Sequence, residues 1–255
     1  MGSALLMGWF RTMPDLLVSV VEPNDLHIVD PNIRHFQSIT DIDPTHTFDL
    51  LVLAVKPQTM KLTCESIKRH LGQLPPVLSI AAGKNLKFYA SQFGETAPVM
   101  RSMPNTPAAI GHGITVICAN QYVPPYSRNL AHQLLSAVGK VEWLDDETLM
   151  DAVTAVSGSG PAYVFLLIEE LANAGMECGL PETVALALAR QTVIGSAYLA
   201  ETEAQIDAAT LRRNVTSPGG TTEAALKVLM GQNGLHTILR EAVAAATQRG
   251  KELAS

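Results

Sequence analysis

The sequence is poor in charge, aromatic rings and cysteine, and each scarcity excludes a class of protein. Only 16% of the 255 residues are charged and 47% are hydrophobic, the reverse of a disordered chain. Acidic residues outnumber basic ones by 24 to 18, so the chain lacks the basic surface that nucleic-acid binding requires. Its three widely spaced cysteines form neither a disulfide framework nor a metal cluster. We therefore expect a folded cytoplasmic protein with a large core.

Long hydrophobic runs, a signal peptide and common catalytic motifs are also missing. Uninterrupted apolar runs such as 50–55 and 162–168 end after six or seven residues, against the ~20 of a membrane span. The first ten residues carry no basic region and no cleavage site, so no secretory signal is expected. Histidine pairs at metal-ligand spacing, G-x-S-x-G elbows and Walker motifs are absent from the sequence. We expect no membrane span and no metal site.

The chain changes character near residue 146. Before this point, short runs of Val, Ile and Leu alternate with helical patterns at 58–71 and 126–138, which predicts βαβ units and a mostly parallel sheet. The expected strands are 16–21, 49–55, 77–82, 99–103, 114–118 and 140–144. Beyond it only helices are expected, at 161–178, 181–201, 219–230 and 235–253. The sequence thus predicts an α/β, Rossmann-like dinucleotide-binding domain over 1–147 and an all-α substrate-binding and dimerisation domain over 148–255.

The helical pattern at 184–199 is rich in alanine and apolar on most of its faces. A helix that is apolar all round is buried in its final environment. A hundred helical residues offer little to cover it, so we expect a subunit interface. Burial against the chain's own N-terminal half is the alternative.

The front of the chain lacks most of a dinucleotide fingerprint. Such a domain opens with a strand that runs into G-x-G-x-x-G and then a helix. Here Gly2 and Ser3 match only the last glycine and the start of that helix. We expect that the chain begins late, through a misplaced start codon or trimming. The neighbours of the absent strand would have exposed edges, and dinucleotide binding would be poor.

An acidic residue follows the next expected strand. Strand 16–21 ends at Glu22, twenty positions after Gly2, where a carboxylate accepts a hydrogen bond from the ribose 2′-OH of a bound dinucleotide. A solvated turn residue before Pro23 is the alternative.

Three successive strands are followed by loops of small or rigid residues. Ligands of open α/β sheets bind at the carboxyl ends of strands, so these loops are expected to form one rim that faces a cofactor. Lys56 could reach a ribose or phosphate, but its spacing alone favours a solvated lysine in a βα loop. The candidate cofactor contacts on this rim are Ala54, Val55, Lys56, Pro57, Ala81, Ala82, Gly83, Pro104 and Asn105.

Two glycine turns in the second half each lead into an expected helix. They are Ser157-Gly158-Ser159-Gly160 before Pro161, and Ser217-Pro218-Gly219-Gly220 before Thr221 and Thr222. Helix N-termini present unpaired N–H groups, which bind anions such as a carboxylate. Ordinary helix capping is the alternative. Two such turns in a helical half favour a small carboxylate substrate held beside a nicotinamide.

Together these motifs resemble those of the pyrroline-5-carboxylate reductase family. The matching stretches, in the family's order, are LLVLAVKP (50–57), SIAAG (79–83), MRSMPNTP (100–107), AVSGSGPAYVF (155–165) and VTSPGGTTEAAL (215–226). The resemblance implies reduction of 1-pyrroline-5-carboxylate to L-proline by NADPH or NADH, the last step of proline biosynthesis. It also implies a homodimer interlocked through the helical domain, and higher oligomers built from such dimers.

The resemblance further assigns roles to individual residues. The substrate carboxylate would lie on the turn formed by Ser217, Gly219, Gly220, Thr221 and Thr222. Thr222 would lie close to the ring nitrogen, and Glu203 is the best match to a glutamate on the substrate's amine side. Gly2, Ser3 and Glu22 would contact the cofactor together with the rim loops. A carboxylate at Glu22 would repel a 2′-phosphate, so we expect NADH to be used better than NADPH.

Two other functions stay open from sequence alone. A β-hydroxyacid dehydrogenase relative would carry a catalytic lysine on its first long helix after the Rossmann half, but 161–178 contains none. A non-catalytic dimerising or dinucleotide-sensing homologue would fit the incomplete fingerprint. The intact SGSGPAY and SPGGTT motifs weigh against it, because an unused site has no need of them.

Overall fold

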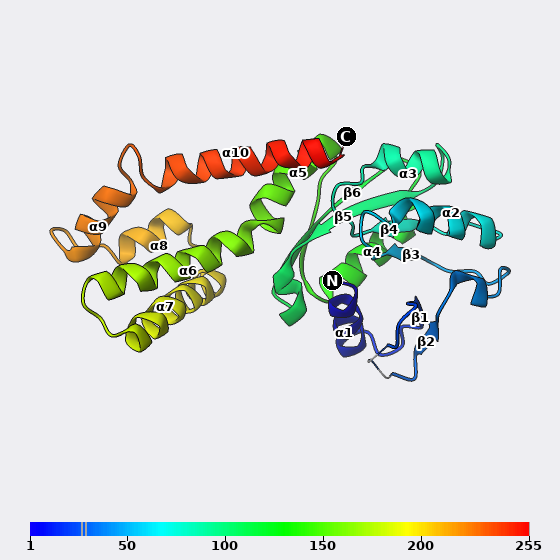
Figure 1. The fold of residues 1–255 in the computed structure, drawn as a ribbon, viewed down its shortest axis with the longest axis horizontal. Helices are drawn as coiled ribbons and strands as arrows, with labels where there is room; N and C mark the ends of the chain where they lie inside the picture. The colour runs from blue at the N-terminus through cyan, green and yellow to red at the C-terminus, as the bar shows by residue number, and fades with distance from the viewer. Residues whose placement is uncertain (27, 29, 255) are drawn as a thin grey trace. The chain divides into compact units, whose positions relative to one another are not determined.

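The computed structural model describes residues 1–26, 28 and 30–254. By compactness the chain divides into one unit of residues 1–159 with 246–255 and a second unit of residues 160–245. The division expected from sequence, after residue 147, stays a prediction. The first unit carries all the described strands, whereas the second is helical (Figure 1).

The main sheet of the first unit has five strands in the order β3-β4-β5-β6-β7. All neighbours are parallel except β5 and β6, which are antiparallel because the connection 105–112 is too short for a crossover. The expected mostly parallel sheet is therefore confirmed. Its strands are β3 (Leu51–Leu53), β4 (Val77–Ser79), β5 (Val99–Pro104), β6 (Gly113–Ala119) and β7 (Gly139–Trp143).

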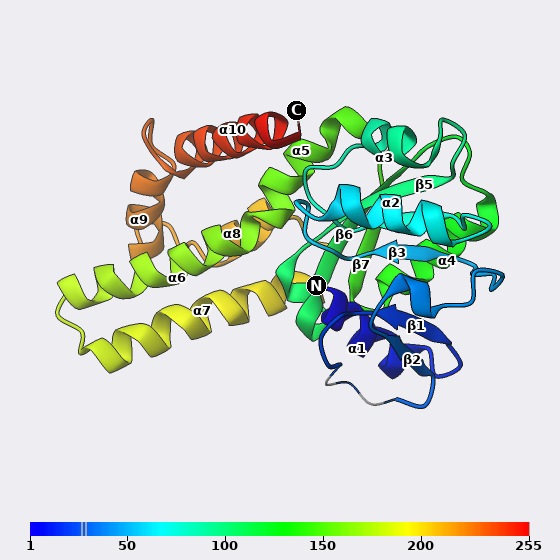
Figure 2. The same ribbon diagram turned by 45° about the vertical axis from the view of Figure 1, so that its right-hand side comes forward.

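Two further strands form a separate parallel pair, β1 (Val18–Val21) and β2 (Ile33–Phe36) (Figure 2). A doubly wound sheet has its first strand between the elements that correspond here to β1 and β3. Among the described residues the ladder is interrupted at that point, and β1 and β3 each have one edge that no described strand pairs with. Strand β2 was not expected, because the polar pair Arg34 and His35 breaks its apolar pattern.

Helices cover both faces of the five-stranded sheet. Helices α1 (Gly2–Thr12) and α4 (Pro125–Ser136) pack on the face that carries Leu78, Met100 and Ile117. Helices α2 (Met60–His70) and α3 (Leu86–Phe93) pack on the opposite face, because strand side chains alternate in direction. The Trp9 indole N–H donates to the Leu134 carbonyl at 2.8 Å and ties α1 to α4. The result is a three-layer arrangement of helix, sheet and helix, which agrees with the predicted α/β, Rossmann-like domain.

The segment that joins the two halves is helical and corrects one expectation. The predicted glycine turn at 157–160 is wrong: α5 (Met150–Val153) runs through the π-helix η4 (Thr154–Gly158) almost directly into α6 (Gly160–Glu177). The Ser159 N–H donates to the Thr154 carbonyl at 2.8 Å, five residues back. This N–H is therefore used inside the helix, whereas anion binding at the start of α6 stays a prediction.

The second unit consists of α6 and α7 (Glu182–Thr202), packed as a pair, followed by α8 (Ala208–Asn214), α9 (Thr221–Leu229) and α10 (Leu235–Ala254), whose last turns belong to the first unit. Gly179, at φ +94°, ends α6 in the left-handed conformation, as its position in the sequence predicts. Of the described residues of α7, only Ala185 and Ala189 are buried. Its other apolar side chains are exposed, apart from the half-buried Val193, so α7 has a large apolar surface that its own chain does not cover.

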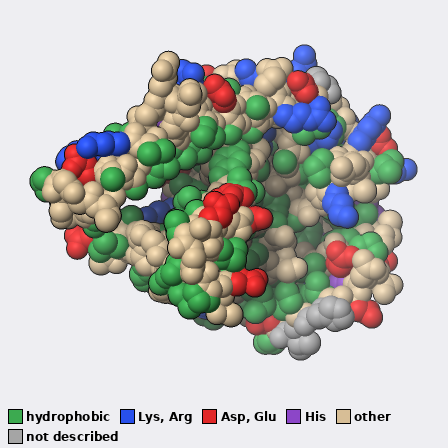
Figure 3. Space-filling model, turned by 60° about the vertical axis from the view of Figure 1, so that its left-hand side comes forward, with side chains coloured by type: hydrophobic (Ala, Val, Ile, Leu, Met, Phe, Trp, Pro, Cys, Tyr) green, Lys and Arg blue, Asp and Glu red, His purple; other side chains and the backbone are tan. Residues whose placement is uncertain are grey.

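Exposed hydrophobic side chains continue along α6. Figure 3 shows hydrophobic side chains at the surface over much of the face in view. Residues Glu147–Glu177 are, by length and composition alone, long and apolar enough to cross a membrane. The search for uninterrupted apolar runs in the sequence did not detect this stretch, because single polar residues interrupt it. Little of it is buried inside the chain, so it too offers an apolar surface to a partner.

Candidate functional site

The three rim loops lie at one edge of the five-stranded sheet. Leu53 pairs with Ser79 and Ser79 with Arg101, so β3, β4 and β5 run side by side in the same direction. Their carboxyl ends therefore open toward the same edge. The structure brings together the predicted contacts of 54–57, 81–83 and 104–105.

The start of α1 lies beside the first of these loops. A Cβ placed on Gly2 would lie 3.4 Å from the Cβ of Ala54, so helix and loop are in contact. Met1 caps α1 without a side-chain hydrogen bond, and the first intrahelical N–H bond described comes from Leu5. The N–H groups of the first turn, including those of Gly2 and Ser3, point out of the helix, where a phosphate binds favourably. The residues present thus fit the phosphate part of a dinucleotide.

The loop after β4 is held by a buried polar contact. The Ala81 N–H donates to Ser79 Oγ at 3.2 Å, and the Tyr89 hydroxyl lies 2.5 Å from the same oxygen. Burial raises the pKa of Tyr89 to about 12. Gly83 has φ +72°, a conformation that favours glycine. Ala82 is exposed between them, so the loop offers its backbone at the surface.

Asn105 is oriented by the strand that follows it. Its Oδ1 accepts the Ile114 N–H at 2.9 Å, which leaves the two amide hydrogens as donors for a ligand. Pro104 is buried and pairs with Thr115 across β5 and β6. Next to them, a Cβ on Gly158 would lie 2.5 Å from the Met103 methyl, so the π-helix packs closely against the end of β5.

Glu22 and Lys56 each lie in the loop that follows a strand, β1 and β3 respectively. Glu22 follows β1, and its Oε1 accepts the Asn24 N–H at 3.1 Å and the Asn24 side-chain amide at 2.8 Å. One carboxylate oxygen is thus held in place at the end of the strand. Lys56 is exposed, and its carbonyl accepts the Thr59 N–H and hydroxyl, both at 3.0 Å.

The turn at 217–222 in the second unit has the form that the sequence predicts. Gly219 has φ +72°, and a Cβ on Gly220 would lie 3.1 Å from the Ser217 carbonyl oxygen, so both positions favour glycine. Thr221 and Thr222 are the first residues of α9. Sequence reasoning missed Glu223, whose Oε2 accepts the Gly219 N–H at 2.5 Å. The turn therefore binds a carboxylate of its own chain.

The position of Glu203 does not by itself indicate a role in the site. It is the exposed C-cap of α7, and its carbonyl accepts the Ile206 N–H at 2.8 Å. None of the hydrogen bonds given for residues 1–26, 28 and 30–254 joins its carboxylate to the 217–222 turn. Its predicted role stays a prediction.

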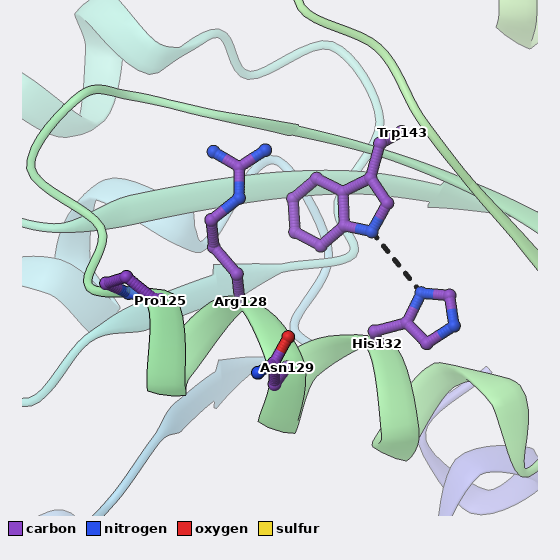
Figure 4. Close-up of a pocket in the computed structure, with 5 residues that line it drawn as sticks. All are labelled: Pro125, Arg128, Asn129, His132 and Trp143. Carbon is purple, nitrogen blue, oxygen red and sulfur yellow. Dashed lines mark hydrogen bonds between the residues drawn. The ribbon is translucent and has the colours of Figure 1, made fainter.

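An open pocket of about 380 Å³ lies away from these residues, on α4 and β7 (Figure 4). The Arg128 guanidinium stacks over the Trp143 ring, with 4.4 Å from its carbon to the ring centroid, and the indole N–H donates to His132 Nδ1 at 3.3 Å. Pro125 and Asn129 complete the lining. No predicted site residue takes part in it.

Comparison with known proteins agrees with this arrangement. Residues 147–253 match the family model described as pyrroline-5-carboxylate reductase dimerisation. The pyrroline-5-carboxylate reductase of Pseudomonas aeruginosa is 46% identical over 206 residues, 81% of this chain and 75% of that protein. The Haemophilus influenzae reductase is 34% identical over 99% of this chain and 94% of its own length. The chain belongs to the pyrroline-5-carboxylate reductase family.

Solved structures of the family extend the match to the fold. A Coxiella burnetii pyrroline-5-carboxylate reductase covers 100% of this chain and 95% of its own, with a TM-score of 0.89 and 34% identity. A Plasmodium falciparum pyrroline carboxylate reductase with NADP bound has a TM-score of 0.82 at 29% identity, with 100% of this chain and 95% of that chain covered. The predicted α/β architecture, NAD(P)H-dependent reductase activity, place at the end of proline biosynthesis and homodimerisation are confirmed at the level of the family.

Proposed function

We propose that this reductase holds the carboxylate of 1-pyrroline-5-carboxylate on the turn formed by Ser217, Gly219, Gly220, Thr221 and Thr222. The observation that carries the proposal is the hydrogen bond from the Gly219 N–H to the Glu223 carboxylate, because a turn that already binds one carboxylate supports binding of another. Thr221 and Thr222 add first-turn N–H groups and hydroxyls at the positive end of α9.

The cofactor contacts in this proposal are the start of α1 and the sheet rim. Gly2 and Ser3 would bind the pyrophosphate, and residues 54–57, 81–83 and 104–105 would line the rest of the dinucleotide. When bound, the reduced nicotinamide supplies the hydride that C5 of the cyclic imine accepts. Glu22 favours NADH over NADPH, because its carboxylate accepts a ribose hydroxyl hydrogen bond and repels a 2′-phosphate.

The chain's own residues orient the imine and stabilise its charge. Thr222 holds the proton of the ring nitrogen, and Glu203 lies on the substrate's amine side. The imine nitrogen is basic enough to be protonated before or during hydride transfer, so a histidine or lysine acid is not required. Catalysis then rests on proximity and on preorganised dipoles.

The assembly in this proposal is a dimer interlocked through the helical halves, from which higher oligomers are built. The exposed apolar side chains of α6 and α7 support it, because a second copy would cover them. A cytosolic location fits the unpaired cysteines Cys64, Cys118 and Cys178.

The experiment is a steady-state assay with 1-pyrroline-5-carboxylate, followed by loss of NADH absorbance, on the parent chain and on Thr222→Ala. The variant should lose roughly tenfold to a thousandfold in kcat, because it lacks the hydroxyl that holds the nitrogen proton. An unchanged kcat would remove Thr222 from the mechanism. A parent chain that binds NADH but shows no turnover would contradict the proposed site as a whole.

A further inference from the structure

A buried ion pair lies beneath the rim of the sheet, outside the residues that the proposed function uses. Arg101 is on β5 and its side chain is only 8% exposed. Its Nη1 donates to Glu147 Oε1 at 2.9 Å, and the Glu147 side chain is 26% exposed. Glu147 begins the short 3₁₀ helix η3 (Glu147–Leu149), at the first residue of the segment that matches the family's dimerisation model.

The same carboxylate oxygen also binds a third element. Glu147 Oε1 accepts the N–H of Leu86, the first residue of α3, at 2.7 Å. This N–H has no partner inside its own helix, and a negative charge at the N-terminus of a helix is favourable. One oxygen atom thus joins the middle of β5 to the start of α3.

The loop 81–85 between β4 and α3 is therefore fixed at both ends. Its first N–H donates to Ser79 Oγ, and its last residue, Asn85, caps α3 by accepting the Phe88 N–H at 2.8 Å. The next N–H, that of Leu86, is the one that Glu147 holds. Between these ends, Ala82 is exposed and Gly83 has its positive φ.

We propose that Arg101 and Glu147 are positioning residues that hold the loop 81–85 in the conformation that receives the dinucleotide. The inference rests on the proposed function, which places residues 81–83 against the cofactor. If an exposed, glycine-containing loop became ordered only when the dinucleotide binds, the loss of loop entropy would lower the affinity for the dinucleotide. The charged acceptor makes the Leu86 hydrogen bond a strong one, and Arg101 fixes the acceptor.

The test compares amide hydrogen exchange and kinetics in two variants and a control. Glu147→Ala removes both bonds but leaves the Arg101 charge buried and unpaired, which destabilises the chain. The double variant Arg101→Met with Glu147→Leu removes both charges and preserves packing, so it keeps the fold while it releases the Leu86 N–H. Glu142→Gln, at an exposed position on β7, is the matched control.

In the double variant we expect exchange in residues 81–88 to rise on the order of tenfold, while exchange in β5 and β6 stays as in the parent. The KM for NADH should rise roughly three- to tenfold, with kcat changed less than about twofold, because binding rather than chemistry is weakened. Glu142→Gln should match the parent in both measurements.

Three outcomes separate the possibilities. If amide exchange in the loop 81–85 is unchanged in the double variant, the proposal is overturned. It is also overturned if the exchange rate rises evenly over β4, β5 and α3, because Arg101 and Glu147 would then only stabilise the fold. Exchange in the parent should also slow in residues 81–85 when NADH or NADPH is added. If exchange does not slow, residues 81–83 do not contact the dinucleotide and that part of the proposed function fails. The effect of Glu147 on the loop is decided by the variants alone.

Discussion

Replacing Tyr89 by phenylalanine should lower stability at neutral pH and raise it in strong alkali. Tyr89 is fully buried, with its hydroxyl 2.5 Å from Ser79 Oγ. Loss of this hydrogen bond costs about 1 kcal/mol, because Ser79 Oγ keeps the Ala81 N–H as a partner. At neutral pH the parent should therefore be the more stable protein.

The opposing effect comes from ionisation of the phenol. Burial raises the pKa of Tyr89 from 10.0 to about 12 in the folded chain. A raised pKa gives stability that is fully present below the unfolded pKa of 10.0 and is lost as pH rises toward 12. The parent loses about 1.4 kcal/mol by about pH 11 from this source, and a phenylalanine loses none. The difference in unfolding free energy between the parent and Tyr89→Phe should thus vanish at about pH 11 and change sign above it.

Urea unfolding of the parent and of Tyr89→Phe, repeated from neutral pH to about pH 11, measures this difference directly. Tyr126→Phe is the matched control, because Tyr126 is 63% exposed and its replacement should change the free energy of unfolding little at any pH. A difference between the parent and Tyr89→Phe that stays constant with pH would refute the argument, since it would mean that burial does not disfavour the phenolate.

Other predictions concern the site and the backbone. Glu22→Ser should raise the ratio of kcat/KM for NADPH to that for NADH by roughly fivefold to tenfold, because a carboxylate no longer faces the 2′-phosphate; an unchanged ratio would exclude Glu22 as a determinant. Glu223→Ala should lower the KM for 1-pyrroline-5-carboxylate by about threefold, since the turn before α9 loses its internal carboxylate; a raised KM would mean that Glu223 assists binding. Gly139→Ala should lower the free energy of unfolding by more than about 3 kcal/mol, because its Cβ would lie 2.0 Å from the Gly113 carbonyl oxygen. Gly94→Ala has open space around it and should lower this free energy by about 1 kcal/mol. Thermal or urea unfolding measures both.

The elements that the sequence predicted well are those with a strong local pattern. The expected strand at 99–103 is observed as Val99–Pro104, and the expected helix at 235–253 as Leu235–Ala254. Long apolar periodicity and proline or glycine boundaries decide such elements locally. Strand β2 was missed because its pairing with β1, rather than its own composition, makes it a strand.

The site was predictable as far as it consists of short motifs. The rim loops follow buried strands, and the SPGGTT turn carries its glycines where the backbone needs them. The contacts that hold these loops were not predictable, because they join distant residues: Arg101 and Glu147 are 46 positions apart. The π-helix at 154–158 escaped prediction for another reason. Gly158 and Gly160 favour a turn in the sequence, whereas in the structure Gly158 lies in the π-helix and packs closely against Met103.

The interrupted ladder between β1 and β3 has a consequence for how the cofactor site unfolds. No backbone hydrogen bonds cross this break in the described sheets, so α1, β1 and β2 are held to the rest by apolar packing and by side-chain hydrogen bonds from Trp9 and Arg11 of α1. We expect such a segment to open as its own cooperative unit, at a lower free energy than strands β3–β7. Gly2, Ser3 and Glu22 belong to the opening unit, whereas the rim loops belong to the stable one. The two ends of one proposed dinucleotide site would then be lost in separate steps, the phosphate and ribose end first.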